Sequence, residues 1–459
     1  MTQSLTEVLA YYDSWLAFNQ HYQRVPGVQA AVYAGDAVAF SGAYGLADVE
    51  NDVPLTEQHL FRIASHSKTF TGTAVLQLVE QGRLRLDDKV EQHVIEIVGT
   101  PLGERTVREL LAHAGGVTRD GLDADWWQLS RSFPDRDQLL DILRQASSAV
   151  IPENDRFKYS NIGYGLLGLV VEAASGTSYN SYVQTAIVGK LGLAGLGPEL
   201  DPSRLAEYAA GYSALSYAEK RVPIEHVDTR ALASATGFFG NARDLVTYFS
   251  AHLPGDDRLL SDKSKREMQH PLWTTGSDEK ARYGLGLSVT KVGERNVFGH
   301  GGGYPGHITR TIVDPEQRIV VSVLTNAIDG PAAQLAEGLF RLLDLADSKD
   351  RGDAVDTAGL ERFTGRFANL WGVTDFVLIG GRLYATDPTG ANPADEPQPL
   401  EADGDSLRVT GGNGYGSYGE SYRFEFDPNG TVRTVHGSSG LTLHPIDRFG
   451  LGERVTVAP

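Results

Sequence analysis

The chain of 459 residues has 59 acidic and 41 basic side chains, a formal net charge of −18, and no cysteine. Its acidity excludes a protein that binds the nucleic-acid backbone through overall charge, because like charges repel. Without cysteine there is no disulfide framework, no thiolate metal site and no cysteine nucleophile. A hydrophobic fraction of 41% allows a large core, and the length predicts two or three domains.

The N-terminal segment, residues 1–7, lacks the basic region and the apolar run that are typical of a signal peptide. No uncharged apolar stretch of the sequence is long enough to span a membrane. We therefore expect a soluble, cytoplasmic protein that binds neither membranes nor nucleic acid. We find no cofactor motif and no metal-ligand motif, so no cofactor and no metal are expected, and the oligomeric state is left open.

The first predicted elements are two β-prone segments, residues 28–34 and 38–44. Between them lies Gly35-Asp36, a dipeptide that is suited to a two-residue hairpin turn. The sequence therefore predicts an antiparallel pair of strands near the start of the chain.

Helical periodicity dominates the middle of the chain. Thr106 and Glu109 have the spacing of a capping box, which predicts a helix start. Strand character returns at residues 308–313 and 319–324, before a helix that is predicted to open at Pro331. Strands at both ends of this region predict an α+β fold, in which helices flank an antiparallel sheet and an all-helical insertion interrupts it.

A polar, charged stretch, residues 349–357, is predicted to be a linker. We therefore expect one domain over residues 1–348 and a second, all-β domain over residues 358–459 that forms a small barrel. Turn residues separate the strand-like segments of this second domain. These segments are residues 376–379, 382–385, 422–426, 431–435 and 441–443.

Ser65 and Lys68 form an S-x-x-K pattern at the start of an apolar-periodic run that stops at Gly82. The pattern predicts that Ser65 opens a helix and that Lys68 lies one turn away on the same face. A serine hydroxyl needs an adjacent base to act as a nucleophile, and a helix N-terminus favours an oxyanion. The same spacing recurs at Ser277 and Lys280 in a polar stretch, so the pattern alone does not identify a catalytic pair.

Tyr159 and Asn161 come directly before residues 162–168, an apolar, glycine-containing segment that predicts a packed helix. A tyrosine beside a lysine can move protons to and from a serine, and an asparagine amide can hold a substrate carbonyl. The alternative interpretation is an ordinary helix-capping turn that contains an asparagine.

A glycine-rich segment, residues 299–306, comes directly before the predicted strand 308–313. Consecutive glycines let a backbone approach a ligand closely, and His300 in this segment can titrate near neutrality. Residues 301–306 also fit a glycine pattern of dinucleotide-binding sites. A strand rather than a helix follows, which argues against that function.

In this order, the S-x-x-K, Y-x-N and H-x-G patterns resemble the three signature elements of the serine β-lactamase-like hydrolases of the peptidase S12 type. Class C β-lactamases, esterases and D-aminopeptidases are members of this superfamily, and the resemblance covers residues 5–345. It implies that Ser65 is the nucleophile and that Lys68 and Tyr159 handle its proton. It also implies a lipocalin-like C-terminal barrel, which either narrows the substrate cleft or serves stability or assembly.

The resemblance implies further site residues. Asn161, His300 and Gly302 would contact the substrate, and the backbone amides of Ser65 and Gly303 would form the oxyanion hole. Where β-lactamases carry Lys-Thr/Ser-Gly, this chain has histidine followed by glycine. An imidazole without a neighbouring hydroxyl anchors a substrate carboxylate less strongly than an ammonium group with a hydroxyl beside it. We therefore expect amides and esters other than β-lactams as substrates.

Residues 120–127 combine three carboxylates with two indoles in a predicted loop. The loop is either a lid that attracts a substrate ammonium group or a solvated turn whose tryptophans pack. For the whole chain, the sequence predicts a serine hydrolase that cleaves a small-molecule or peptide amide or ester through an acyl-enzyme on Ser65. The alternatives are a transacylase that passes the acyl group to an alcohol or amine, and a penicillin-binding sensor or structural protein with little turnover.

Overall fold

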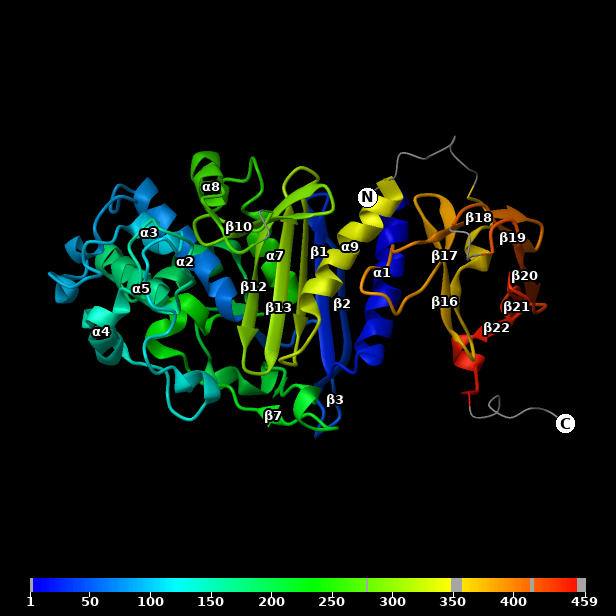
Figure 1. Cartoon of the computed structure of the whole chain (residues 1–459), viewed down its shortest axis with the longest axis horizontal. Coiled ribbons are helices and arrows are strands. Elements are labelled where there is room, and N and C mark those ends of the chain that lie inside the picture. The colour runs from blue at the N-terminus through cyan, green and yellow to red at the C-terminus, as the bar shows by residue number, and fades with distance from the viewer. Residues whose placement is uncertain (1–2, 278–279, 348–356, 413–416, 452–459) are drawn as a thin grey trace. The chain divides into compact units, whose positions relative to one another are not determined.

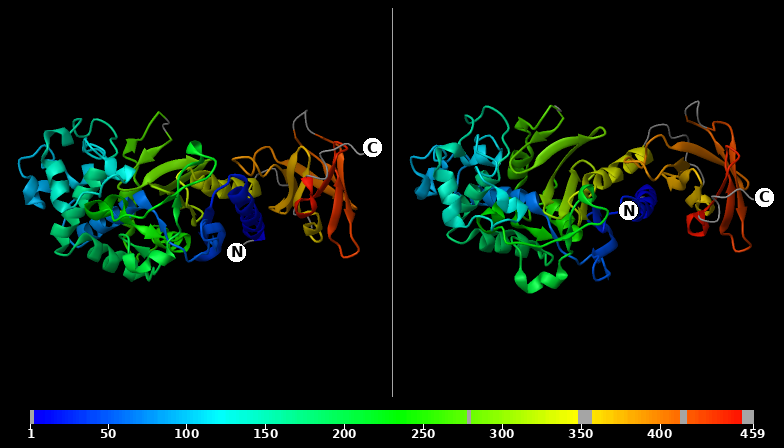
Figure 2. Two further views of the ribbon diagram at one scale, coloured as in Figure 1. Left: turned by 90° about the horizontal axis from the view of Figure 1, so that it is seen from below. Right: turned by 60° about the horizontal axis from the view of Figure 1, so that its bottom comes forward.

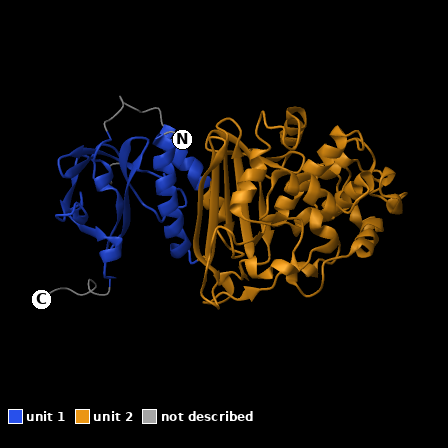
Figure 3. Ribbon diagram, turned by 180° about the vertical axis from the view of Figure 1, so that it is seen from behind, with its two compact units in different colours: residues 1–24, 337–459 blue, residues 25–336 orange. Residues whose placement is uncertain are grey.

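The computed structural model divides into two compact units, residues 25–336 and residues 1–24 together with 337–459 (Figure 3). Of the predicted linker 349–357, only Thr357 belongs to the described residues. No helix in the described part of the chain is long and apolar enough to cross a membrane. The structure describes residues 3–277, 280–347, 357–412 and 417–451.

A nine-stranded antiparallel sheet is the main sheet of the unit 25–336 (Figure 1). The strand order is β3-β2-β1-β14-β13-β12-β11-β10-β9, so the first hairpin pairs with the last strand of the unit through β1 and β14. The predicted hairpin and the two later strands are confirmed. The strands are β1 (Gly27–Ala34), β2 (Ala37–Asp48), β3 (Val53–Pro54), β9 (Trp273–Thr274), β10 (Arg282–Tyr283), β11 (Ser288–Val292), β12 (Arg295–Tyr304), β13 (His307–Asp314) and β14 (Ile319–Thr325).

The chain between β3 and β9 is mainly helical, and Figure 2 shows this part on one side of the sheet. The predicted capping box is present, because the Thr106 side chain accepts from the Glu109 amide while the Glu109 side chain accepts from the Thr106 amide. The predicted helical insertion is present, but it is not all-helical, because the short strands β4 to β8 also lie within it. Its α-helices are α2 (Ser67–Glu80), α3 (Val107–Leu111), α4 (Arg136–Arg144), α5 (Asn161–Ser175), α6 (Tyr179–Val183), α7 (Ala242–Ser250) and α8 (Asp262–Gln269).

Two small sheets of short strands lie within the helical part. Helix α7 packs against β1 and β14 of the main sheet. One small sheet has the order β4-β8-β5, and a second is the pair β6-β7. These strands are β4 (Phe61–Arg62), β5 (Leu196–Gly197), β6 (Gly211–Tyr212), β7 (Pro223–Ile224) and β8 (Phe239–Gly240). β4 leads directly into the predicted nucleophile, so the small sheet fixes the approach of the chain to Ser65.

The other unit contains a closed eight-stranded antiparallel barrel, which confirms the predicted all-β tail. Phenylalanine side chains fill its interior, among them Phe367, Phe376 and Phe424. The helix α1 (Gln3–Tyr22) belongs to the same unit, and α9 (Ala332–Asp347) leads into it. The barrel strands are β15 (Gly365–Asn369), β16 (Gly372–Ile379), β17 (Arg382–Thr386), β18 (Gln398–Asp403), β19 (Ser406–Val409), β20 (Ser421–Phe426), β21 (Val432–His436) and β22 (Thr442–Pro445).

Candidate active site

Ser65 lies in a 3₁₀ turn, η1 (Ala64–His66), that runs directly into α2. The prediction that Ser65 opens a helix is therefore correct, with one tighter turn before the α-helix begins. Ala64 has φ = +48°, a left-handed conformation that costs about 1 to 3 kcal/mol for a residue with a side chain. Ala64 and His66 are buried, whereas Ser65 is partly exposed. The turn thus presents one hydroxyl to the surface.

The Ser65 hydroxyl is contacted by both predicted proton-handling groups. Lys68 Nζ lies 3.2 Å from Ser65 Oγ, and the hydroxyl of Tyr159 lies 2.8 Å from the same oxygen. These distances are within the range in which a base takes a proton from a nucleophile. The lysine from the same helical turn and the tyrosine from 94 residues further along the chain therefore meet at one atom.

Lys68 is fully buried, and its amine is held by acceptors on two further elements. Nζ donates to Asn161 Oδ1 and to the carbonyl of Ala235, at 2.8 Å each. Ala235 belongs to a short π-helix, η10 (Ala233–Gly237). Burial lowers the pKa of Lys68 well below its ordinary value, while the charge of Asp120 acts in the opposite direction. The amine is thus suited to be neutral and to accept a proton.

Tyr159 is the complementary acid of the pair. Burial raises the pKa of Tyr159 above its ordinary value, and the hydrogen bond to Ser65 only partly offsets this. The phenol therefore keeps its proton, so Lys68 is the group that can take the proton of Ser65. Lys68 Nζ also lies 4.8 Å from the centre of the Tyr159 ring, a cation–π distance that would stabilise the ammonium once it forms.

Asn161 is the first residue of α5, and Ser160 is its N-cap, with Oγ accepting from the Gly163 amide at 2.8 Å. The capping turn that we considered as an alternative is thus present, but Ser160 makes it rather than Asn161. Asn161 instead directs its amide to Lys68 and to Asp120. A capping turn and a site residue therefore coexist in one short motif.

The glycine-rich segment forms the second half of strand β12, and His300 lies within it. The imidazole is 5% exposed, with Nε2 at 3.0 Å from the Tyr283 hydroxyl and Nδ1 at 2.6 Å from the Gly301 carbonyl. Burial, with the nearby His66 and Lys68, lowers the pKa of His300 well below its ordinary value. His300 is therefore neutral and does not titrate near neutrality. Its contact with substrate stays a prediction.

Among the described residues, β11 pairs with β12 only as far as Gly299. From His300 to Tyr304, the ladder of β12 is made with β13 alone. The opposite backbone edge of this segment has no strand partner in the described parts of the chain. Such an edge offers main-chain amides and carbonyls to an extended ligand. The predicted oxyanion donor Gly303 lies on this segment, and its role stays a prediction.

Gly302 is the point where β12 approaches η1 most closely. A Cβ atom at Gly302 would lie 2.1 Å from the carbonyl oxygen of Ile63, two residues before the nucleophile. We expect Gly302→Ala to push β12 away from η1, lowering kcat/KM by about a hundredfold, since a displacement of about 1 Å has that effect. It should also reduce the free energy of unfolding by about 1 to 3 kcal/mol through overpacking.

Gly301 supplies the matched control for this prediction, and Gly303, the predicted oxyanion donor, supplies a comparison in which alanine fits but the site itself is altered. A Cβ at Gly301 would lie 3.4 Å from its nearest neighbour, and one at Gly303 would lie 3.6 Å away, so alanine fits at both positions. Steady-state rates and thermal melting of the three variants check the expectation. Equal rates for Gly302→Ala and Gly301→Ala would contradict it.

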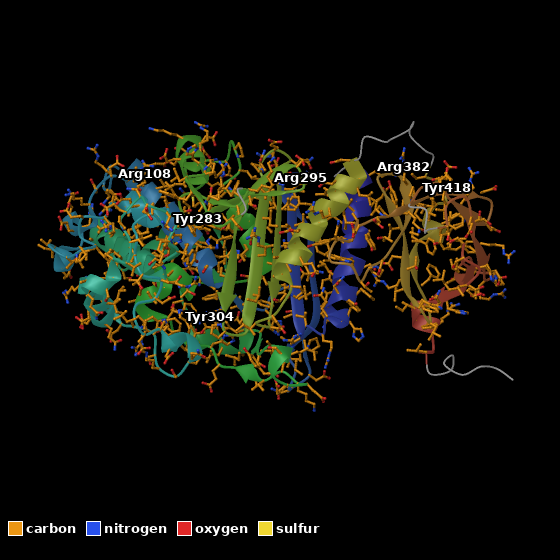
Figure 4. The ribbon with its side chains drawn as sticks, in the orientation of Figure 1. Arg108, Tyr283, Arg295, Tyr304, Arg382 and Tyr418 are labelled. Carbon is orange, nitrogen blue, oxygen red and sulfur yellow. The ribbon has the colours of Figure 1, made fainter. Side chains whose placement is uncertain are left out.

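Aromatic residues from outside the three motifs surround Tyr159. The ring of His113 lies 4.3 Å from that of Tyr159, and His113 Nδ1 accepts from the Ser160 amide at 3.1 Å. Tyr283, labelled in Figure 4, lies 4.9 Å from His113 and also contacts His300. Aromatic contacts between distant segments leave no spacing pattern, so the three motifs do not indicate these residues.

In the segment 120–127 the two tryptophans pack, whereas Leu122 and two of the three carboxylates are exposed. Trp126 is 3% exposed, and the indole Nε1 of Trp127 donates to Asp120 Oδ1 at 3.1 Å. Asp123 and Asp125 are exposed, as expected for a solvated turn, but Asp120 is buried. The structure therefore favours the packing interpretation for the tryptophans and separates Asp120 from the other two carboxylates.

Two observations limit the alternatives. Of the second S-x-x-K pattern, the residues between Ser277 and Lys280 lie outside the described part of the chain, so no catalytic geometry is defined there. Within the described residues, no group of three or more histidine, aspartate or glutamate side chains could hold a metal ion. The geometry around Ser65 is thus the candidate site for the chemistry.

The fold and this site define a β-lactamase-fold serine hydrolase. The chain belongs to the Beta-lactamase family, whose model matches residues 15–345. It is 28% identical over 362 residues to "Penicillin-binding protein 4*" of Bacillus subtilis (strain 168), an alignment that covers 74% of this chain and 79% of that protein.

Two solved structures are similar to the chain over different shares of its length. The octameric penicillin-binding protein homologue from Pyrococcus abyssi has a TM-score of 0.67 at 24% identity, and the match covers 93% of this chain and 97% of that one. The D-amino acid amidase from Ochrobactrum anthropi SV3, in complex with D-phenylalanine, has a TM-score of 0.61 at 22% identity. The match covers 73% of this chain and 97% of the amidase chain. The first likeness includes the barrel unit, and both show the fold.

Proposed function

We propose that the protein cleaves an amide or ester by forming an acyl-enzyme on Ser65, with a substrate of the D-amino acid amide or D-peptide type preferred over a β-lactam. One observation carries the proposal. Ser65 Oγ lies within 3.2 Å of a buried lysine amine and within 2.8 Å of a buried phenol. This arrangement supplies a base and an acid to one partly exposed nucleophile.

In the first step, Ser65 Oγ attacks the carbonyl carbon and its proton moves to the neutral amine of Lys68. The carbonyl oxygen becomes an oxyanion, which the backbone amides of Ser65 and Gly303 stabilise in this proposal. When the C–N or C–O bond breaks, the departing amine or alcohol takes a proton from Tyr159 or from the ammonium of Lys68. Water then attacks the acyl-enzyme through the same groups and releases the acid.

The preference for a non-β-lactam substrate is supported by His300. Because its imidazole is neutral and both ring nitrogens are close to protein partners, it offers no cation to a β-lactam carboxylate. Among the similar structures, one is a D-amino acid amidase, whereas two of the reported relatives are named for penicillin binding. The unpaired edge of β12 next to Gly303 also suits an extended, peptide-like substrate better than a fused ring.

The test uses an aryl ester, a D-alanyl anilide, its L-alanyl counterpart and a chromogenic cephalosporin. Turnover is measured for each, and the intact mass of the protein is recorded in rapidly quenched samples, with the acylated peptide sequenced. We expect turnover of the ester and the D-anilide and an adduct on the peptide that contains Ser65. Fast cephalosporin hydrolysis would contradict the substrate preference, and an adduct elsewhere would contradict the mechanism. Adding an alcohol or amine acceptor separates hydrolysis from acyl transfer.

A further inference from the structure

Asp120 is a buried carboxylate, 7% exposed, that the reaction outlined above does not use. Its Oδ1 atom accepts two hydrogen bonds, from Asn161 Nδ2 at 2.8 Å and from Trp127 Nε1 at 3.1 Å. Its Oδ2 atom lies 3.3 Å from Arg119 Nε. A buried carboxylate with this set of partners is fixed in place, and it is therefore not available as a direct partner for a substrate ammonium group.

The contact with Asp120 has a consequence for Asn161. A side-chain amide has a donor end and an acceptor end, and an ionised carboxylate can only accept. The donor end of Asn161 must therefore face Asp120, so that its acceptor end, Oδ1, faces Lys68 Nζ at 2.8 Å. If the amide were rotated by half a turn, two oxygens would meet at Asp120 and two nitrogens would meet at Lys68.

We propose that Asp120 is a positioning residue of this site: it orients the amide of Asn161 toward Lys68 and balances the charge that Lys68 gains during the reaction. The inference rests on the proposed function, because it assigns the cause of the geometry around Lys68. The chain of contacts runs from Trp127 through Asp120 and Asn161 to Lys68, and thus links the loop 120–127 to the base.

Other groups near Lys68 also influence its pKa. Arg119 opposes Asp120, since its guanidinium lowers the pKa of Lys68 whereas Asp120 raises it. Burial keeps the remaining groups neutral, because it lowers the pKa of the histidines and raises the pKa of the tyrosines. The titratable and charged groups that face Lys68 are Arg119, Asp120, His113, Tyr159, Tyr164 and His300.

The experiment compares Asp120→Asn and Asp120→Ala in the full-length protein, with Asp123→Asn as the matched control in the same loop. Because the hydrogen bonds from Asn161 and Trp127 fall on one oxygen, asparagine can accept both, and it removes the charge together with the ion pair to the exposed Arg119. Asp123 is exposed and pairs with Arg131, so its neutralisation leaves the site unchanged. The readout is the rate at which a fluorophosphonate labels Ser65 as a function of pH, followed by intact mass, with thermal melting to confirm the fold.

For Asp120→Asn we expect the highest rate to stay within about threefold of wild type, while the acidic limb of the pH profile moves to lower pH by about 0.5 to 1 unit. For Asp120→Ala we expect the highest rate to fall by about 10- to 100-fold, because Asn161 is no longer held. Asp123→Asn should match wild type. An unshifted limb in Asp120→Asn would overturn the role of the charge, and an unchanged rate in Asp120→Ala would overturn the role in orientation.

The readout separates two kinds of failure. If wild-type protein is not labelled at Ser65, the proposed function fails. If wild type is labelled and both Asp120 variants behave like wild type, only the present inference fails.

Discussion

Ser65→Ala is expected to lower kcat/KM for every ester or amide substrate by at least about 10³-fold, because removal of a serine nucleophile abolishes the covalent route. The variant should also give no acyl adduct and no fluorophosphonate adduct in the mass spectrum. Loss of one hydroxyl from a partly exposed turn leaves the fold intact, so thermal melting should stay within about 2 °C of wild type.

The chain contains its own control for this prediction. Ser277 opens the second S-x-x-K pattern, so Ser277→Ala removes a serine with the same sequence spacing. We expect Ser277→Ala to keep full activity. Turnover that survives in Ser65→Ala but is lost in Ser277→Ala would assign the chemistry to the other pattern.

Lys68→Met is expected to lower kcat/KM by about 10³- to 10⁴-fold while Ser65 remains in place. The substitution removes the amine that contacts the Ser65 hydroxyl and takes its proton in the proposed mechanism. Methionine has a similar length and carries no charge into the buried site. Lys280→Met, in the second pattern, should behave like wild type. A Lys68→Met variant with more than about a tenth of wild-type activity would exclude Lys68 as the base.

Lys68 also determines the expected pH dependence of the activity. Only the neutral amine of Lys68 can take the proton of Ser65, so activity is expected to fall as pH drops through the pKa of Lys68. Burial lowers this pKa below its ordinary value, and the acidic limb therefore lies below the range in which an exposed lysine titrates. In Lys68→Met, the residual rate should lack this limb. A wild-type profile that is flat from neutral pH to the acidic end of stability would contradict the assignment.

The proximity of Ser65 and Lys68 could be predicted from the sequence because it is local. Residues three apart in a helical turn share a face whatever the rest of the chain does, so Ser65 and Lys68 meet by spacing alone. Tyr159 and Asn161 needed the resemblance to a superfamily, since nothing in the sequence indicates that α5 begins beside α2. The strands were predictable for a similar reason, because alternation and turn residues are read within a few positions.

The groups that tune the site could not be predicted. The carbonyl of Ala235 reaches Lys68 from a π-helix, and backbone acceptors carry no signature in the side-chain sequence. Asp120 looked like one of three solvated loop carboxylates until the structure placed it against Asn161 and Trp127. The charge of His300 was left open by the sequence, and the burial that lowers its pKa is visible only in the structure. Burial and orientation are properties of tertiary packing, and a spacing pattern does not contain them.

The helix α1 shares a compact unit with the barrel although most of the chain separates them in sequence. Trp15 Nε1 donates to the carbonyl of Pro388 at 3.1 Å, and the amide of Gly381 donates to Glu7 at 2.8 Å. During synthesis, α1 leaves the ribosome long before these partners do, whereas residues 25–336 form a continuous segment that can fold in between. We therefore expect the unit that holds Ser65 to fold first. The unit that contains both α1 and the barrel is completed last.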